Sequence, residues 1–224
     1  MPGSTRVDSL ARQLIGAGEW RGAVSEYAIR ALDATTWDAF ARLAEKHKGM
    51  GFGGCWCTWF HSRVGRPEGE KGRPWKERLV REGNAHAALV FDGDAAVAWA
   101  QYGSPDELPN IHHRKDYEAG RTEELPDYRI TCIFVDRDYR RKGVAGVALG
   151  GALDLIANAG GGVVEGYPQD LPEGKKISSS FLYNVTRSLY EQTGFSYDRP
   201  KGKNHCVMRR TVSPVKKPRR ARVG

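Results

Sequence analysis

The chain has 224 residues, of which 40% are hydrophobic and 28% are charged. That length can bury one substantial core and requires no second independent domain. No apolar run approaches the roughly 20 residues of a transmembrane helix, and the N-terminus lacks the pattern of a secretory signal, so we expect no membrane protein. The four cysteines are scattered, which favours a reducing, cytoplasmic location over a disulfide framework.

The formal net charge of +8 is concentrated at the C-terminus, where residues 211–224 hold five basic residues and no acidic one. Removing those five charges from +8 leaves +3, so the remainder is only mildly basic. We interpret residues 213–224 as a disordered basic tail. The alternative interpretation is that the tail binds nucleic acid. We expect no nucleic-acid contact by the rest of the chain. The five residues are Lys216, Lys217, Arg219, Arg220 and Arg222.

The N-terminal part predicts two helices and one strand. Apolar residues at helical spacing within residues 9–16 predict a short helix, so we treat residues 1–26 as a helical N-terminal extension. Alternation in residues 27–32 predicts a first strand. A second helix follows, capped by Asp33 or Thr35. Its buried face is predicted at Trp37, Phe40, Leu43 and Ala44.

Residues 49–63 combine glycines with aromatic residues, which is the most unusual composition in the chain. Such a segment can form the wall of a pocket, or its aromatic residues can pack in the core. Cys55-x-Cys57 with His61 has the residue types of a zinc site, but no second ligand pair follows at metal-binding spacing. We therefore predict no metal.

The middle of the chain predicts a short helix and a hairpin. Residues 75–81 have the helical pattern, and residues 85–91 and 95–102 flank Asp92-Gly93-Asp94, the strongest hairpin signal in the sequence. With the strand at residues 128–135, the two hairpin strands should form an antiparallel meander.

A long charged connection spans residues 103–127. Long loops in compact domains are usually functional or mobile. Its side chains at His112, His113, Asp116 and Glu118 could reach a ligand, and a solvated loop is the other interpretation.

The stretch from residue 128 to residue 151 predicts a strand, a charged loop and a helix start. Apolar residues end at Val135, basic residues follow in the loop, and Gly143 precedes small and apolar residues at helical spacing. A helix start exposes unpaired N–H groups and the positive end of the helix dipole. The segment therefore suits a phosphate group, although a solvated turn would use the same residues.

The C-terminal third predicts one helix among three strands. Residues 163–167 form the first strand, and residues 195–198 and 205–210 form the last two. The helix between them is capped by Ser178 to Ser180. Its buried face is predicted at Phe181, Leu182, Val185 and Leu189.

Two motifs in order resemble the GNAT superfamily of N-acetyltransferases. Arg140-x-x-Gly143-x-Ala145 directly after a strand resembles that superfamily's acyl-CoA pyrophosphate loop. Downstream, Tyr190-Glu191-Gln192-Thr193-Gly194-Phe195 resembles its late helix, which ends at a glycine followed by an aromatic strand. The resemblance covers roughly residues 27–210 in outline, and it places the domain boundaries at residues 27 and 212.

The resemblance implies an α/β (α+β) fold with a GNAT-like mixed, mostly antiparallel central sheet flanked by helices. It also implies acetyl-CoA as cosubstrate, transfer of the acetyl group to a primary amine of a small molecule or protein, and no metal. The cofactor-binding residues would be Ile133, Phe134 and Val135 of the strand and Arg140, Arg141, Lys142, Gly143, Val144 and Ala145 of the loop. By position, residues 49–63 would border the acceptor amine.

The resemblance supplies a candidate catalytic acid, and the predicted strands supply a candidate base. Tyr190 occupies the position of the general acid that protonates the departing thiolate, and its phenol has a suitable pKa, near 10. Glu165 is the only carboxylate within a predicted central strand, where burial would raise its pKa, so it is our candidate base. The alternative is that its side chain faces outward. The sequence departs from the superfamily's pattern at two positions. Arg137 stands where the superfamily often has a proline before the loop. Asn184 lies six residues before Tyr190, whereas the superfamily's asparagine lies seven before, so we do not assign Asn184 that asparagine's contact with the cofactor.

Two questions stay open at this stage. A non-catalytic acyl-CoA-binding or sensing module would keep the same loop without the chemistry. The sequence names neither the acceptor nor the oligomeric state, although exposed edge strands are compatible with a homodimer.

Overall fold

The computed structural model describes residues 27–50, 54–121, 124–170 and 184–215. Within these residues one seven-stranded sheet has the order β1-β2-β3-β4-β5-β7-β6. Its strands are β1 (Tyr27–Ala31), β2 (His86–Asp92), β3 (Ala95–Gly103), β4 (Tyr128–Val135), β5 (Gly162–Gly166), β6 (Ser196–Pro200) and β7 (Cys206–Val212). The helices are α1 (Trp37–Lys46), α3 (Arg73–Arg81), α4 (Arg114–Ala119), α5 (Val144–Asn158) and α6 (Arg187–Gln192), with a 3-10 turn η1 (Arg137–Tyr139).

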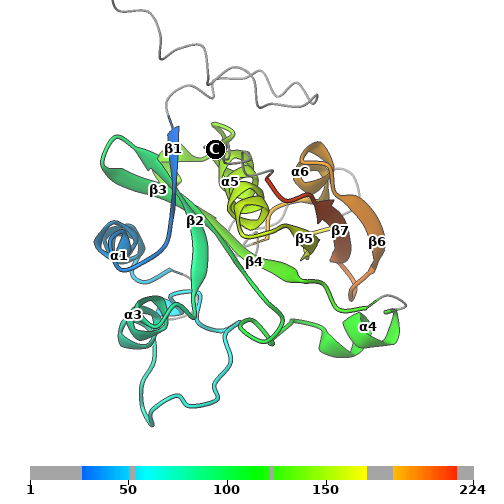
Figure 1. Cartoon of the computed structure of the whole chain (residues 1–224), viewed down its shortest axis with the longest axis horizontal. Helices are drawn as coiled ribbons and strands as arrows, with labels where there is room; N and C mark the ends of the chain where they lie inside the picture. Colours follow the sequence, from blue (N-terminus) through cyan, green and yellow to red (C-terminus); the bar gives the residue numbers. More distant parts are fainter. Residues whose placement is uncertain (1–26, 51–53, 122–123, 171–183, 216–224) are drawn as a thin grey trace, which may run out of the picture.

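Helices cover both faces of the sheet. Helices α1 and α3 lie on one face, and α5 lies on the other (Figure 1). Central strands therefore bury both sides, as strand β2 shows: Leu89 and Phe91 join the core under α1 and α3, whereas Ala88 and Val90 join the core under α5. This explains the almost uninterrupted apolar run of β2, because a strand covered on both faces has no polar alternation.

The sheet is antiparallel except at its centre. Strands β2, β3 and β4 form the predicted meander, and β1 adds to it by pairing antiparallel with β2. Strands β5, β7 and β6 are also paired antiparallel. Strand β4 is parallel to β5, and the paired residues are Tyr128, Arg129 and Ile130 of β4. Among the described strands, the rest of β4 has no partner on that side. The predicted mixed, mostly antiparallel sheet flanked by helices is confirmed.

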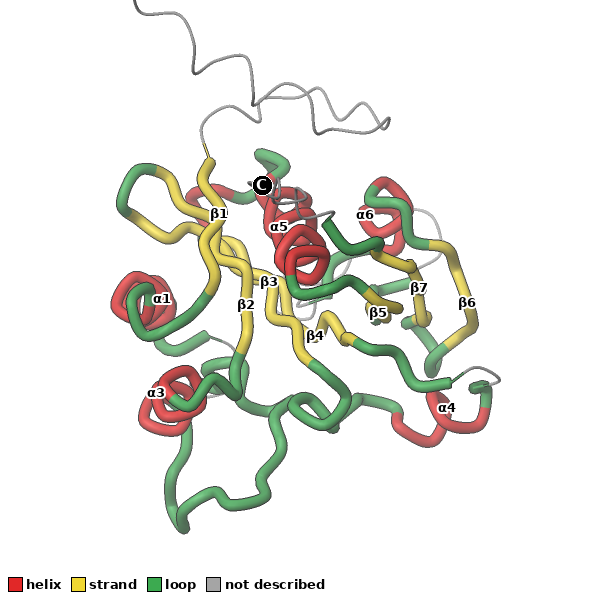
Figure 2. Tube along the Cα trace, viewed as in Figure 1, coloured by secondary structure: helices red, strands yellow, loops and turns green. Residues whose placement is uncertain are grey.

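Two predicted segments differ from the structure. The connection of residues 103–127 contains helix α4, seen in Figure 2 as a short helix between β3 and β4. The last helix cannot run through Val185, because that residue has a left-handed φ of 51°, and α6 begins only at Arg187. Left-handed backbone is costly for a β-branched side chain and does not continue a helix.

Several predictions fall on residues that the structure does not describe. These are the helix at residues 9–16, the caps at Ser178 to Ser180 and most of the basic tail. No helix among the described residues is both long and apolar enough to cross a membrane.

Candidate functional site

The loop between β4 and α5 is fastened to helix α1. The Asp136 carboxylate accepts hydrogen bonds from Lys46 Nζ (2.7 Å) and the Asp138 amide (3.1 Å), and it contacts His47 Nε2 at 3.2 Å. Burial alone would raise the pKa of Asp136, but the hydrogen bonds from Lys46 and the amide lower it below its ordinary value. The carboxylate therefore stays charged and fixes the direction in which the chain leaves the strand.

The start of α5 presents free amides beside exposed cations. The first hydrogen bonds of the helix are donated by Gly146 and Val147 to Gly143 O, at 2.9 and 3.3 Å. The amides of Gly143, Val144 and Ala145 precede these bonds, and a helix leaves its first N–H groups without intrahelical partners. Both Arg141 and Gly143 have left-handed φ values, 62° and 78°. Alternation of left-handed and ordinary residues turns successive amides toward one concave side, which suits an anion.

The charges on this loop are not neutralised within the described structure. Arg140, Arg141 and Lys142 are exposed, and none of the ion pairs among the described residues includes them. Arg140 Nε donates instead to Val135 O at 3.3 Å, and Lys142 Nζ lies 5.1 Å from the centre of the Tyr139 ring. Positive side chains thus surround the positive end of the α5 dipole.

The unpaired half of β4 forms one side of a gap that faces this loop. Asp136 N donates to Val97 O, and Val135 lies opposite Ala98 in the register with β3. Backbone groups of alternate residues point to opposite sides of a strand. Ile133 and Val135 therefore direct their backbone groups into the gap, whereas Phe134, predicted with them, directs its backbone toward β3.

Tyr190 lies against the end of β5, in the core on the α5 side of the sheet. Its ring is completely buried and contacts Phe195 edge-on, with the ring centres 4.9 Å apart. The ring lies so close to Gly166 that a Cβ atom there would be 2.0 Å from Tyr190 Cε1. Its hydroxyl has no hydrogen-bond partner among the described residues, and burial raises its pKa.

Glu165 lies on the opposite face of β5 from Tyr190, so the structure does not bring the two predicted catalytic residues together. Its Oε2 accepts hydrogen bonds from the hydroxyls of Tyr117 (2.9 Å) and Tyr167 (3.0 Å), and its Oε1 accepts from Arg209 at 2.9 Å. The carboxylate is fully buried. Glu165 is the acceptor at the centre of a buried network, and its role as a base stays a prediction.

The residues considered as zinc ligands are engaged elsewhere. Cys57 Sγ lies 2.8 Å from Cys132 Sγ of β4, and His61 Nε2 lies 3.0 Å from the Nζ of buried Lys76. Lys76 also donates to Gln101 Oε1 at 2.7 Å. No group of three or more His, Cys, Asp or Glu within the described ranges is arranged to hold a metal ion.

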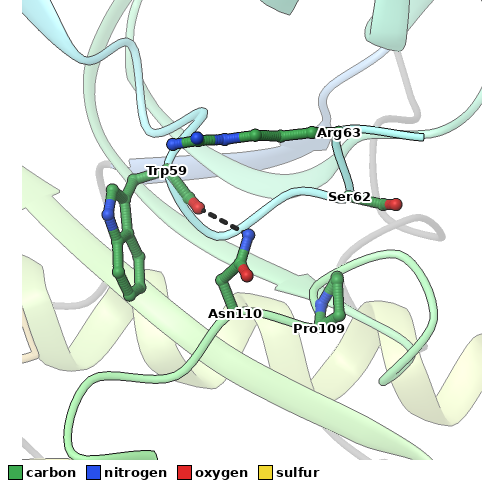
Figure 3. A pocket seen from close by; sticks show the side chains of 5 residues that line it. All are labelled: Trp59, Ser62, Arg63, Pro109 and Asn110. Carbon is green, nitrogen blue, oxygen red and sulfur yellow. Dashed lines mark hydrogen bonds between the residues drawn. The ribbon is translucent and has the colours of Figure 1, made fainter. Parts of the chain in front are cut away.

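A pocket of about 360 Å³ lies between the aromatic segment and the connection after β3. In Figure 3 the Trp59 ring lies at the left, the Arg63 side chain extends toward it at the top, and Asn110 lies below Arg63 beside Pro109. Both interpretations of residues 49–63 hold in part, because Trp56 and Phe60 pack in the core whereas Trp59 lines the pocket. Nothing in the sequence indicated Asn110. The residues that line the pocket are Trp59, Ser62, Arg63, Pro109 and Asn110.

The sheet has the mixed, mostly antiparallel arrangement that the sequence resemblance implied. A parallel strand pair separates at the centre of a mostly antiparallel sheet, and the strand that leaves the pair leads into a cationic helix start. The helix start occurs where the sequence predicts it, after Gly143, whereas the separation of β4 from β5 was not predicted.

Comparison with family models and with curated protein sequences finds no match. Solved structures similar to this chain include a Desulfovibrio desulfuricans protein assigned to the GNAT acetyltransferase family, at 17% identity over 84% of this chain and 99% of that one, with a TM-score of 0.46. The ribosomal-protein-S18-alanine N-acetyltransferase of Escherichia coli is 13% identical over 85% and 97%, with a TM-score of 0.43. The PaiA N-acetyltransferase of Thermoplasma acidophilum, solved with coenzyme A, is 13% identical over 83% and 98%, with a TM-score of 0.42.

Proposed function

We propose that this protein is an acetyl-CoA-dependent N-acetyltransferase that transfers an acetyl group to a primary amine. The observation that carries the proposal is the continuity between the open edge of β4 and the start of α5. Hydrogen-bonding backbone at Ile133 and Val135 leads within one short loop to the free amides from Gly143 to Ala145. An elongated ligand with amide groups at one end and a pyrophosphate at the other matches that arrangement.

In this proposal the two parts of the site bind different parts of acetyl-CoA. The pyrophosphate is held by the amides of Gly143, Val144 and Ala145, with Arg140, Arg141 and Lys142 supplying charge. The pantetheine amides and the acetyl carbonyl pair with the backbone of Ile133 and Val135, as an added strand would. No metal takes part.

The transfer itself requires little covalent help from the protein. The thioester is already activated, so the amine attacks its carbonyl carbon directly once both are positioned, and a backbone N–H on the open edge of β4 stabilises the oxyanion. The C–S bond then breaks, and the proton that the amine loses passes to water. Tyr190 is the general acid for the departing thiolate. Its support is the buried hydroxyl, which has a proton to donate and no acceptor among the described residues.

A calorimetric titration with acetyl-CoA, and separately with CoA, tests the proposal. Gly143→Glu places a carboxylate where the phosphates would lie, and we expect binding to fall by at least about a hundredfold, given the roughly 1.5–3 kcal/mol of each charge-assisted hydrogen bond lost. The control is Gly150→Glu, which adds the same charge further along α5, into open space. Equal binding by wild type and Gly143→Glu, or no binding by wild type, would refute a cofactor site here.

A further variant guards against misfolding of Gly143→Glu, because the φ of 78° at that position disfavours a side chain. Arg140→Gln leaves the backbone unchanged and should weaken acetyl-CoA binding severalfold. That loss should shrink at high salt, since an exposed charge contact is screened.

A non-catalytic acyl-CoA-binding module is the second candidate function. One observation favours it: Glu165, the predicted base, already accepts from two tyrosines and Arg209 in a closed network. Binding of acetyl-CoA without acetyl transfer across a broad panel of amines would support this candidate. Turnover that Tyr190→Phe abolishes, with cofactor binding retained, would exclude it.

We place this activity in the cytoplasm, in keeping with four cysteines that are all unpaired thiols. Strands β1 and β6 form the two edges of the sheet. A homodimer that pairs one of these edges remains part of the proposal, and sedimentation of the purified protein tests it.

A further inference from the structure

The pocket beside Trp59 has walls that are held together before any ligand arrives. Asn110 Nδ2 donates to two carbonyls of the aromatic segment, Trp59 O at 3.1 Å and His61 O at 2.9 Å. The backbone adds a further link, because Ser62 N donates to Glu107 O at 3.2 Å. Two loops far apart in the sequence are therefore joined into one preorganised wall, which lowers the entropic cost of binding.

Trp59 supplies a fixed aromatic surface to this pocket. Its ring is stacked on His112 with the ring centres 3.8 Å apart and the planes within 6°, and 37% of the residue is exposed. Burial lowers the pKa of His112 to about 4, with Lys201 adding to the shift, so the stacked imidazole is neutral at pH 7. The stack stiffens Trp59 without placing a charge against it, and the exposed part of the ring is available to a flat apolar group.

Arg63 supplies the only formal charge among the lining residues. Its side chain is exposed, and the ion pairs found within the described residues do not include it. In Figure 3 the guanidinium end of Arg63 extends across the pocket toward Trp59. A planar guanidinium binds a carboxylate through two parallel hydrogen bonds. The pocket thus combines an anion-binding group with an aromatic surface, and its volume of about 360 Å³ suits a molecule of amino-acid size.

The pocket is connected to the β4–β5 gap through side chains on the face opposite α5. His112 O accepts a hydrogen bond from the buried Lys201 Nζ at 3.0 Å. That Nζ lies 5.2 Å from the centre of the Tyr167 ring, and Tyr167 directly follows Gly166, the last residue of β5. The pocket wall and the end of β5, where its pairing with β4 stops, are thus joined through buried groups on the face of the sheet opposite α5.

We propose that this pocket binds the acceptor, and that the acceptor is an amine carrying a carboxylate and a flat apolar group, as an aromatic amino acid does. Arg63 binds the carboxylate and Trp59 stacks against the apolar group. The assignment of the ligand as an acceptor rests on the proposed acetyltransferase function, whereas the binding chemistry of the pocket stands without it.

The test compares L-phenylalanine with L-phenylalaninamide, which share the ring and the α-amine and differ in the carboxylate. Affinity is measured by calorimetry for both probes with and without CoA, and kcat/KM is measured with acetyl-CoA. We expect the wild type to prefer phenylalanine, and Arg63→Gln to reduce the phenylalanine-to-amide ratio by about tenfold or more, the loss of a charge-assisted contact. Trp59→Ala should weaken both probes equally and leave the ratio unchanged.

Arg42→Gln is the matched control, because Arg42 is an exposed arginine of α1 outside the pocket, and its removal changes the net charge equally. It should leave the ratio as in wild type. Equal affinity for the two probes, an unchanged ratio in Arg63→Gln, or no binding of either probe would overturn the proposal. The binding experiments without CoA test the pocket alone. The acetyl-CoA titration tests the proposed function, so failure of one proposal can be distinguished from failure of the other.

Discussion

Gly166→Ala should destabilise the protein strongly, because the end of β5 has no room for a side chain. A Cβ atom at this position would lie 2.0 Å from Tyr190 Cε1, 2.6 Å from Cζ and 2.8 Å from the hydroxyl. Carbon atoms in contact are about 3.5 Å apart, so a fully buried ring would have to move by roughly 1.5 Å. Overpacking of this kind costs about 1–3 kcal/mol of unfolding free energy.

Urea denaturation measures this effect, and two further variants make it specific. Gly150→Ala has open space and lies within α5, so it should stabilise the protein by about 0.5–1 kcal/mol. In a Tyr190→Ala background the obstructing ring is gone, and Gly166→Ala should cost little. Additive losses in the double variant would refute the close contact between Gly166 and Tyr190.

Three further predictions concern single side chains. Tyr190→Phe should leave the free energy of unfolding unchanged or higher, because it removes a buried hydroxyl that lacks a partner, while kcat falls by about 10²–10⁴-fold; denaturation and steady-state kinetics check the two parts. The hydrogen bond that His86 Nδ1 donates to the Glu107 carboxylate raises the pKa of His86. Glu107→Gln should therefore destabilise the protein below the unfolded pKa of about 6.5 and progressively less as pH rises through the folded pKa, which urea denaturation at pH 5.5 and 9 would show. Loss of Lys46 in Lys46→Met should raise the pKa of Asp136, measurable by NMR titration, since Lys46 donates to that carboxylate at 2.7 Å.

The local features of the candidate site could be predicted from the sequence. The strand ending at Val135, the cationic loop and the helix after Gly143 are contiguous, so short-range patterns contain the information they need. The hairpin between β2 and β3 could be predicted in the same way, because Asp92-Gly93-Asp94 separates two apolar runs.

Features that depend on distant residues could not be predicted in the same way. Helix α4 has six residues and buries only Tyr117, whose hydroxyl donates to Glu165 on β5, so its stability comes from a partner that local periodicity does not reveal. Burial of Lys76 depends likewise on His61 and Gln101, which contact its Nζ but lie far from it in the sequence.

The pocket illustrates the same limit for function. Trp59 and Asn110 are far apart in the chain and meet because the two loops are joined by hydrogen bonds. The aromatic composition of residues 49–63 indicated either a pocket wall or core packing, and it gave no information on the residues that face Trp59 across the pocket. Polar residues such as Asn110 give no periodic signal, and their role follows only from the partners they reach.

The parallel junction at the centre of the sheet has a mechanical consequence. Among the described strands, the pairing between the four-stranded half of the sheet and the three-stranded half extends over three residue pairs, beginning with Tyr128 and Val164. Such a short seam resists shear and bending less than the long antiparallel ladders on either side. A molecule that bonds along the open edge of β4 would therefore act as a brace between the halves as well as a reactant. Its binding should protect the amides of Ile133 and Val135 from hydrogen exchange.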